Sequence, residues 1–140
     1  MNDKWGRRLF MAGGVALVAL GLVHALSLFA KMVPANDTER QLLQLMGSYK
    51  FNLMGSSRSM ENLMRGFSIS FMLGVWGLGA LDLVLVRERL GLLKRVALVN
   101  VIWLAVMTAV SLRYFFAAPS FCLTVTFVIF GLAWVQLPAE

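Results

Sequence analysis

Four stretches of the chain are almost wholly apolar, and each is bounded by basic residues or by proline. They span about residues 9–30, 67–86, 96–112 and 120–137. A helix that crosses a membrane needs roughly 20 mostly apolar residues, with a usual range of about 17–25, so all four stretches are long enough. The pattern predicts an all-α, polytopic membrane protein in which four transmembrane helices form an antiparallel bundle, as a single domain over residues 1–140.

The connection between the first two stretches, residues 31–66, is the only long one, and it has a helical pattern of its own. Asn36 is followed three residues later by Glu39, the signature of an N-cap with a capping box. Apolar residues then recur at spacings of three and four, at Leu42, Leu45, Met46, Tyr49 and Leu53. This pattern predicts an amphipathic surface helix between the first two spans. Gly55-Ser-Ser57 interrupts it, and Ser57 is expected to cap the helix that leads into the second span.

The composition agrees with a membrane protein and excludes several other classes. Hydrophobic residues make up 59% of the chain and charged residues 14%, against about 45–50% and about 25% in a soluble domain. One Cys and one His exclude an internal disulfide, a Cys-rich metal site and bis-His haem ligation within one copy. We therefore expect no cofactor and no metal. The net charge of +6 does not indicate nucleic-acid binding, because the basic residues fall mainly at the ends of the apolar stretches.

The first apolar stretch is preceded by basic residues, as a signal peptide would be. Its length is 22 residues, however, against about 7–15 for the apolar region of a signal peptide, and no clean A-x-A site ends it. We expect it to be a retained membrane anchor.

Basic residues are densest in the short turn between the second and third spans, at Arg87, Arg89, Lys94 and Arg95. Cytoplasmic loops carry an excess of Lys and Arg. With an even number of spans, the sequence predicts that both termini lie in the cytoplasm.

Small residues recur along the first two spans at the spacing by which membrane helices pack closely. The first span carries Gly14, Gly21 and Ala25, and the second carries Gly66, Ser70, Gly74 and Gly77. We expect these two small-residue stripes to form a tight contact between the two helices.

Polar residues inside spans are costly, so their depth indicates which of them can meet. Asp82 and Asn100 each lie five residues inside a basic boundary, at Arg87 and Arg95. They are therefore level, and we expect them to hydrogen-bond as a structural brace. His24 lies near the opposite leaflet by helical rise, so an acid–base pair of His24 with Asp82 is rejected.

A second polar group is predicted at the other side of the membrane, beneath the long connection. His24 and Ser70 are level there, and the start of the second span lies above them with Arg58, Met60, Glu61, Met64, Arg65 and Phe67. These residues are the candidate ligand-binding site, covered by residues 36–54 as a lid. A buried His24 that is simply hydrogen-bonded to a serine is the structural alternative. Methionine here is expected to line a pocket rather than to bind Cu(I), because no Met/His/Cys cluster accompanies it.

Two segments, Gly21-Leu-Val-His24 and Ser57-Arg-Ser-Met-Glu-Asn-Leu-Met-Arg-Gly-Phe-Ser68, resemble small four-helix membrane proteins of bacteria. The similarity covers roughly the first 85 residues. The resemblance implies four spans and a bacterial inner membrane, and it implies no reaction.

The leading functional hypothesis is a non-enzymatic membrane protein that holds a lipid-like or amphipathic ligand in an outward-facing cavity. The alternatives are an accessory subunit that packs on another membrane protein, a small dimeric transporter, and an intramembrane isomerase that uses His24 and Glu61. The chain has no phosphate-binding loop, nucleophile elbow or dinucleotide-binding motif. The expected partners are thus membrane lipids, another membrane protein or a second copy of the chain.

Overall fold

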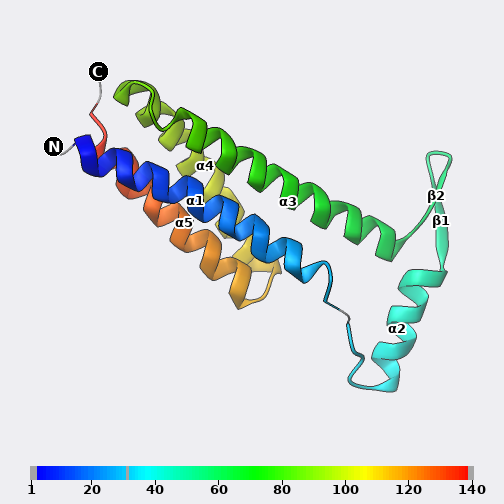
Figure 1. Ribbon diagram of the computed structural model, residues 1–140. Helices are drawn as coiled ribbons and strands as arrows, with labels where there is room; N and C mark the ends of the chain where they lie inside the picture. The colour runs from blue at the N-terminus through cyan, green and yellow to red at the C-terminus, as the bar shows by residue number, and fades with distance from the viewer. Residues whose placement is uncertain (1–2, 31, 139–140) are drawn as a thin grey trace. The chain divides into compact units, whose positions relative to one another are not determined.

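The computed structural model describes residues 3–30 and 32–138 and confirms an all-α membrane protein (Figure 1). Four of its helices are long and apolar enough to cross a membrane: α1 (Asp3–Ser27), α3 (Met60–Leu85), α4 (Leu90–Tyr114) and α5 (Ala117–Gln136). Between α1 and α3 lie a shorter helix and two strands: α2 (Asp37–Ser48), β1 (Lys50–Leu53) and β2 (Ser56–Ser59). The helices α1 and α3 begin earlier than their apolar stretches because polar residues extend each helix by about two turns beyond its apolar part.

The chain divides into two compact units, and the helices α1 and α3 each have one part in either unit. The four-helix unit comprises residues 1–20 and 75–140, and the hairpin unit comprises residues 21–74. The buried apolar core belongs to the four-helix unit, where Phe10 of α1 meets Phe130 of α5 edge to face, with ring centroids 5.7 Å apart. The beginning of α1 lies beside the end of α5, since a Cβ atom on Gly6 would be 3.0 Å from the Leu137 side chain. These two helices are therefore antiparallel neighbours.

Hydrogen bonds join α4 to α5 at both ends of the pair. Lys94 Nζ donates to the carbonyl oxygen of Leu137 at 2.8 Å, and the hydroxyls of Ser111 and Ser120 lie 2.9 Å apart. Such partners stabilise polar side chains that are buried in a span, because lipid offers none.

The close contact of α1 with α3 in the four-helix unit is made by glycines, but only one of them was predicted. A Cβ atom on Gly79 would lie 2.9 Å from the carbonyl oxygen of Gly14, and one on Gly14 would lie 3.2 Å from Asp82 Cβ. The buried residues of α3 are Val75, Gly79 and Asp82, at spacings of four and three.

The prediction that the small-residue stripe of α3 packs closely against α1 was wrong. A Cβ atom on Gly66, Gly74 or Gly77 would meet nothing within 4 Å, so these glycines face open space. At about 100° per residue, Gly77 lies on nearly the opposite side of the helix from Gly79 and Val75. On α1, Gly14 makes the expected contact with α3; farther along, Gly21 is buried and Ala25 is half-buried.

The N-terminus of α2 is capped as the sequence predicts. Asn36 Oδ1 accepts a hydrogen bond from the backbone N–H of Glu39 at 2.8 Å. Glu39 Oε2 accepts from the backbone N–H of Ala35 at 2.6 Å, one residue before the position of a standard capping box. No residue of α2 is buried, so its apolar face, which includes Leu42 and Leu45, is exposed.

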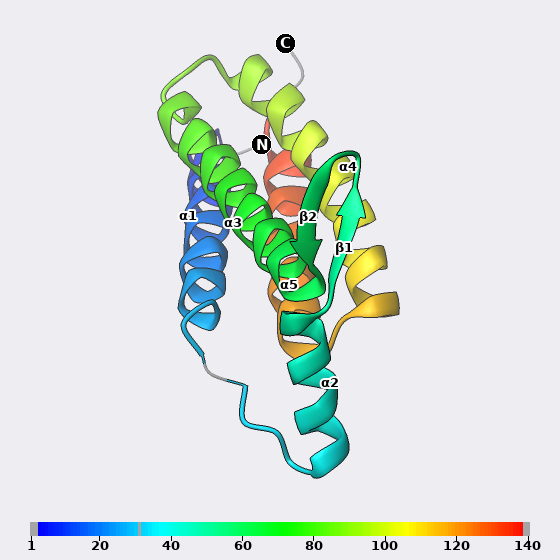
Figure 2. The ribbon, with the colours of Figure 1, turned by 90° about the vertical axis from the view of Figure 1, so that its right-hand side faces the viewer.

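The amphipathic helix is shorter than predicted, because a β-hairpin follows it (Figure 2). The helix ends at Ser48, and β1 and β2 then pair in antiparallel register from Lys50 with Ser59 to Leu53 with Ser56. Met54 and Gly55 form a two-residue turn with φ of 50° and 84°, the positive values that a type I′ hairpin turn needs. The spacing of Tyr49 and Leu53 fits both a helix and a strand, which explains the incorrect prediction.

The cap of α3 is also two residues later than predicted. Ser59, not Ser57, accepts a hydrogen bond through its Oγ from the backbone N–H of Asn62, at 3.3 Å. Ser57 is paired with Asn52 in the hairpin.

Candidate functional site

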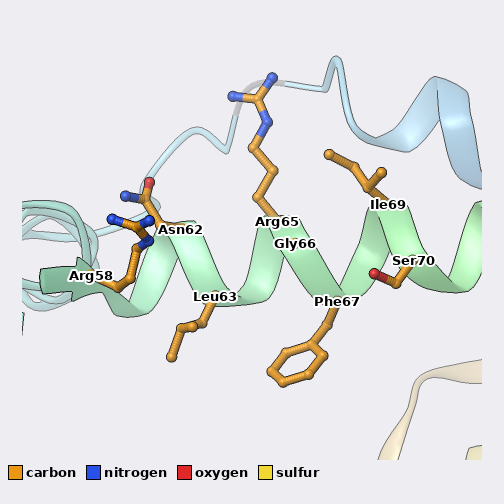
Figure 3. Close-up of a pocket in the computed structure, with 8 residues that line it drawn as sticks. All are labelled: Arg58, Asn62, Leu63, Arg65, Gly66, Phe67, Ile69 and Ser70. Atoms are coloured by element: carbon orange, nitrogen blue, oxygen red, sulfur yellow. The ribbon is translucent and has the colours of Figure 1, made fainter. Parts of the chain in front are cut away.

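The hairpin unit contains an open groove of about 460 Å³ along the first half of α3 (Figure 3). It is lined by Arg58, Asn62, Leu63, Arg65, Gly66, Phe67, Ile69 and Ser70. Arg58 comes from strand β2, and the other residues come from three successive turns of α3. The site is therefore built by one continuous segment, which the Ser59 cap and the hairpin hold in place.

The floor of the groove is small or polar, and its walls are larger. Asn62, Gly66 and Ser70 recur every four residues and so lie along one face of the helix. Arg65 and Ile69 project to one side of this face, and Leu63 and Phe67 project to the other. Because Gly66 has no side chain and a Cβ atom there would meet nothing, the middle of the floor is open.

The groove carries positive charge through Arg58 and Arg65, and both residues are exposed. Arg58 Nη1 donates to the neighbouring carbonyl oxygen of Ser57 at 3.0 Å, which uses one of five guanidinium donors. Within residues 3–30 and 32–138, the one salt bridge joins Arg40 to Asp37, so no carboxylate of this part neutralises either arginine. The groove therefore combines free cationic donors with apolar walls.

The groove brings together four of the eight predicted ligand-binding residues, Arg58, Arg65, Phe67 and Ser70. Met60 and Met64 are exposed and lie outside its lining, and Glu61 points towards α2, where its Oε2 would be 2.8 Å from a Cβ atom on Gly47. The groove is also not covered by the predicted lid, since no residue of 36–54 lines it. The sequence places all of these residues near the start of α3 but does not indicate which face of the helix is hollow. This explains why some of the predicted residues lie outside the groove.

His24 lies elsewhere in the hairpin unit and does not line the groove. Its ring packs edge to face on Phe71, with centroids 5.1 Å apart. Ser27 Oγ donates to the backbone carbonyl of His24 at 2.6 Å rather than to its ring. Among the described residues, Nε2 of His24 has no hydrogen-bond partner, which differs from the expected serine-bonded histidine. Within residues 3–30 and 32–138, no hydrogen bond joins His24 to Glu61.

Asn62, Leu63 and Ile69 were missed by the sequence analysis, and Gly66 was assigned to helix packing. The sequence does contain a signal for this site, because Asn62, Gly66 and Ser70 recur every four residues next to the basic residue Arg65.

Within residues 3–30 and 32–138, no group of three His, Cys, Asp or Glu side chains lies close enough to hold a metal ion.

The hydrogen bond predicted between Asp82 and Asn100 is present in the four-helix unit. Asn100 Nδ2 donates towards both carboxylate oxygens of Asp82, at 3.0 and 2.9 Å, and both residues are buried. Nearby, Trp76 Nε1 donates to the backbone carbonyl of Val18 at 3.1 Å, so this indole links α3 to α1.

Comparison with protein-family models, with curated proteins and with solved structures finds no match to this chain. Functional inference therefore depends on the geometry and chemistry of the chain itself, and a bacterial inner membrane stays a prediction.

Proposed function

We propose that this protein is a non-enzymatic membrane protein, located in a bacterial inner membrane with both termini in the cytoplasm, that binds a lipid-like, amphipathic ligand in the groove of α3. The observation that carries the proposal is the meeting of two exposed arginines with apolar side chains along one open groove. Arginine forms strong, often bidentate hydrogen bonds with phosphate and carboxylate groups.

The two ends of such a ligand have matching surroundings in the groove. Arg58 and Arg65 suit an anionic head group, and the side chains of Asn62 and Ser70 add neutral hydrogen-bonding groups along the floor. The side chains of Leu63, Phe67 and Ile69 offer apolar contact to a chain that lies beside them, at about 25 cal/mol for each Å² removed from water.

Filling the groove tests the proposal directly. Gly66→Leu places a side chain on the open floor, and leucine favours a helix more than glycine does, so the fold should be retained. We expect mass spectrometry of the detergent-extracted protein to find much less co-purifying lipid-like ligand than in the unmodified protein. Arg58→Gln with Arg65→Gln should cause a similar loss, whereas the matched control Arg40→Gln with Lys50→Gln should not. Equal amounts of ligand in all four proteins would contradict the proposal.

A second candidate, an accessory subunit or homodimer, is favoured by a different observation. The face of α3 with Gly66, Gly74 and Gly77 is open, and small residues at such spacing are a common contact surface between membrane helices. Gly77 lies outside the groove lining, so Gly77→Leu distinguishes the two candidates. If Gly77→Leu abolishes association with a second copy or a partner and leaves ligand content unchanged, α3 is a docking helix.

A further inference from the structure

A second hollow lies in the four-helix unit, where the beginning of α1 meets the end of α3. It has a volume of about 310 Å³ and is lined by Lys4, Arg7, Arg8, Met11, Val86 and Arg87. Four of the six lining residues are cationic and the other two are apolar. This composition differs from that of a purely solvated charge cluster, because the cations line an open hollow that also has an apolar side.

Arg7 holds the two helices together at this place. Its Nη1 donates to the carbonyl oxygen of Val86, and its Nη2 donates to that of Glu88 at 3.0 Å. Both acceptors lie in the turn that follows α3, so the guanidinium satisfies backbone carbonyl groups outside the helix. These hydrogen bonds hold one side of the hollow in place, and they use the Arg7 guanidinium for the fold.

The other three cations keep their donors available. Lys4, Arg8 and Arg87 are exposed, and within residues 3–30 and 32–138 none of them forms a salt bridge. Arg8 Cζ lies 5.9 Å from the centroid of the Trp5 ring, which is within the range of a cation–π contact. Trp5 is itself 54% exposed, as expected of an aromatic residue that anchors a helix at the membrane interface. Asp3 and Glu88, the sequence neighbours of Lys4 and Arg87, are exposed as well. Their two negative charges are fewer than the four positive charges that line the hollow, so the charge there is positive.

We infer that this hollow is a binding site for the phosphate head group of an anionic phospholipid. Basic pockets between transmembrane helices bind such head groups, and Met11 and Val86 place apolar surface where the acyl chains of a lipid would begin. A lipid fits this arrangement better than free phosphate, because free phosphate would gain nothing from the apolar side. The site shares no residue with the groove of α3, so this inference can be tested independently of the proposed function.

The test uses the full chain in nanodiscs that contain phosphatidylglycerol and phosphatidylcholine in equal amounts, followed by release into detergent and native mass spectrometry. The unmodified protein should retain phosphatidylglycerol in preference to phosphatidylcholine. Repeating the measurement with Gly66→Leu, whose α3 groove is filled, removes any lipid held there from the comparison.

A triple variant removes the three exposed cations together, with Lys4→Gln, Arg8→Gln and Arg87→Gln, and each substitution is also made singly. We expect retention of phosphatidylglycerol to fall about fivefold for each charge removed. The matched control, Arg40→Gln with Lys50→Gln and Arg113→Gln, removes the same charge elsewhere and should retain the lipid. If the triple variant does not fold, the single variants at Arg8 and Arg87 give the same test, because both side chains are exposed.

Two results would overturn the inference. Equal losses in the variants and in the control would mean that net charge, and no particular site, attracts the lipid. Displacement of phosphatidylglycerol by excess inorganic phosphate, with phosphate bound in its place, would mean that the hollow takes a free anion.

Discussion

Both carboxylate oxygens of Asp82 lie within hydrogen-bond distance of a single nitrogen, Nδ2 of Asn100, at 3.0 and 2.9 Å. The two residues are buried on α3 and α4, and the carbonyl oxygen of the same amide, Asn100 Oδ1, has no partner among the described residues. Asp82 thus uses the donor of the amide and leaves its acceptor unpaired.

This arrangement predicts that Asp82→Asn is tolerated. The new side chain has almost the same size and keeps one oxygen that can accept from Asn100 Nδ2, so the variant should keep nearly the full free energy of unfolding. Asp82→Leu leaves the Asn100 amide buried without a partner and should cost about 0.6–1.7 kcal/mol, from the average to the maximum of interhelical polar contacts in membranes. Thermal unfolding in detergent measures both, with Glu88→Gln as an exposed control. A large loss of stability in Asp82→Asn would show that the fold needs the negative charge.

A second prediction separates the two glycines of α3 that lie two residues apart. Gly79→Leu must displace the backbone of α1 near Gly14, because a Cβ atom at residue 79 is already only 2.9 Å from a carbonyl oxygen. Overpacking of this kind costs about 1–3 kcal/mol. Gly77→Leu, which meets open space, is the matched control and should unfold at the same temperature as the unmodified protein or above it. Equal destabilisation of both variants would place Gly77 in the contact after all.

The hairpin turn gives a third prediction. Met54 has a φ of 50°, a left-handed conformation that costs most residues about 1–2 kcal/mol and that asparagine tolerates. Met54→Asn should therefore slow amide hydrogen exchange across β1 and β2 by up to about fivefold. Gly55→Ala should have the opposite effect, because the φ of 84° at this position favours glycine. Faster exchange in Met54→Asn would mean that the methionine side chain itself stabilises the hairpin.

The fourth prediction concerns the membrane topology. The contact of Gly6 with Leu137 brings the beginning of α1 to the end of α5. Cysteines introduced at Asp3 and Pro138, after Cys122→Ser removes the native cysteine, should react with a membrane-impermeant reagent from the same side. The density of basic residues around Arg87 and Lys94 predicts that this side is the cytoplasm. A cysteine at Asp37 should react from the opposite side. Labelling of residues 3 and 138 from different sides would contradict an even number of spans.

Several features of this protein could be predicted from single segments of sequence. The caps and spans depend on local patterns: Asn36 needs only the N–H of Glu39, and each apolar stretch needs only its own length. The level positions of Asp82 and Asn100 also follow from counting residues along two helices joined by a short turn. The hairpin could not be predicted in this way. The spacing of Tyr49 and Leu53 fits both the helical and the strand period, and the pairing of β1 with β2 depends on two separate segments.

The sequence by itself determined which segments cross the membrane, because lipid demands a minimum length of apolar helix and each segment meets that demand alone. Only the tertiary structure decided which face of each helix is buried. In a soluble protein the apolar face of a helix identifies its buried side, but in lipid an exposed face is as apolar as a buried one. For this reason the sequence could not distinguish Gly79, which contacts α1, from Gly77, which faces open space. The same ambiguity hid the groove at Asn62 and Gly66, which depends on which side of α3 the rest of the hairpin unit leaves uncovered.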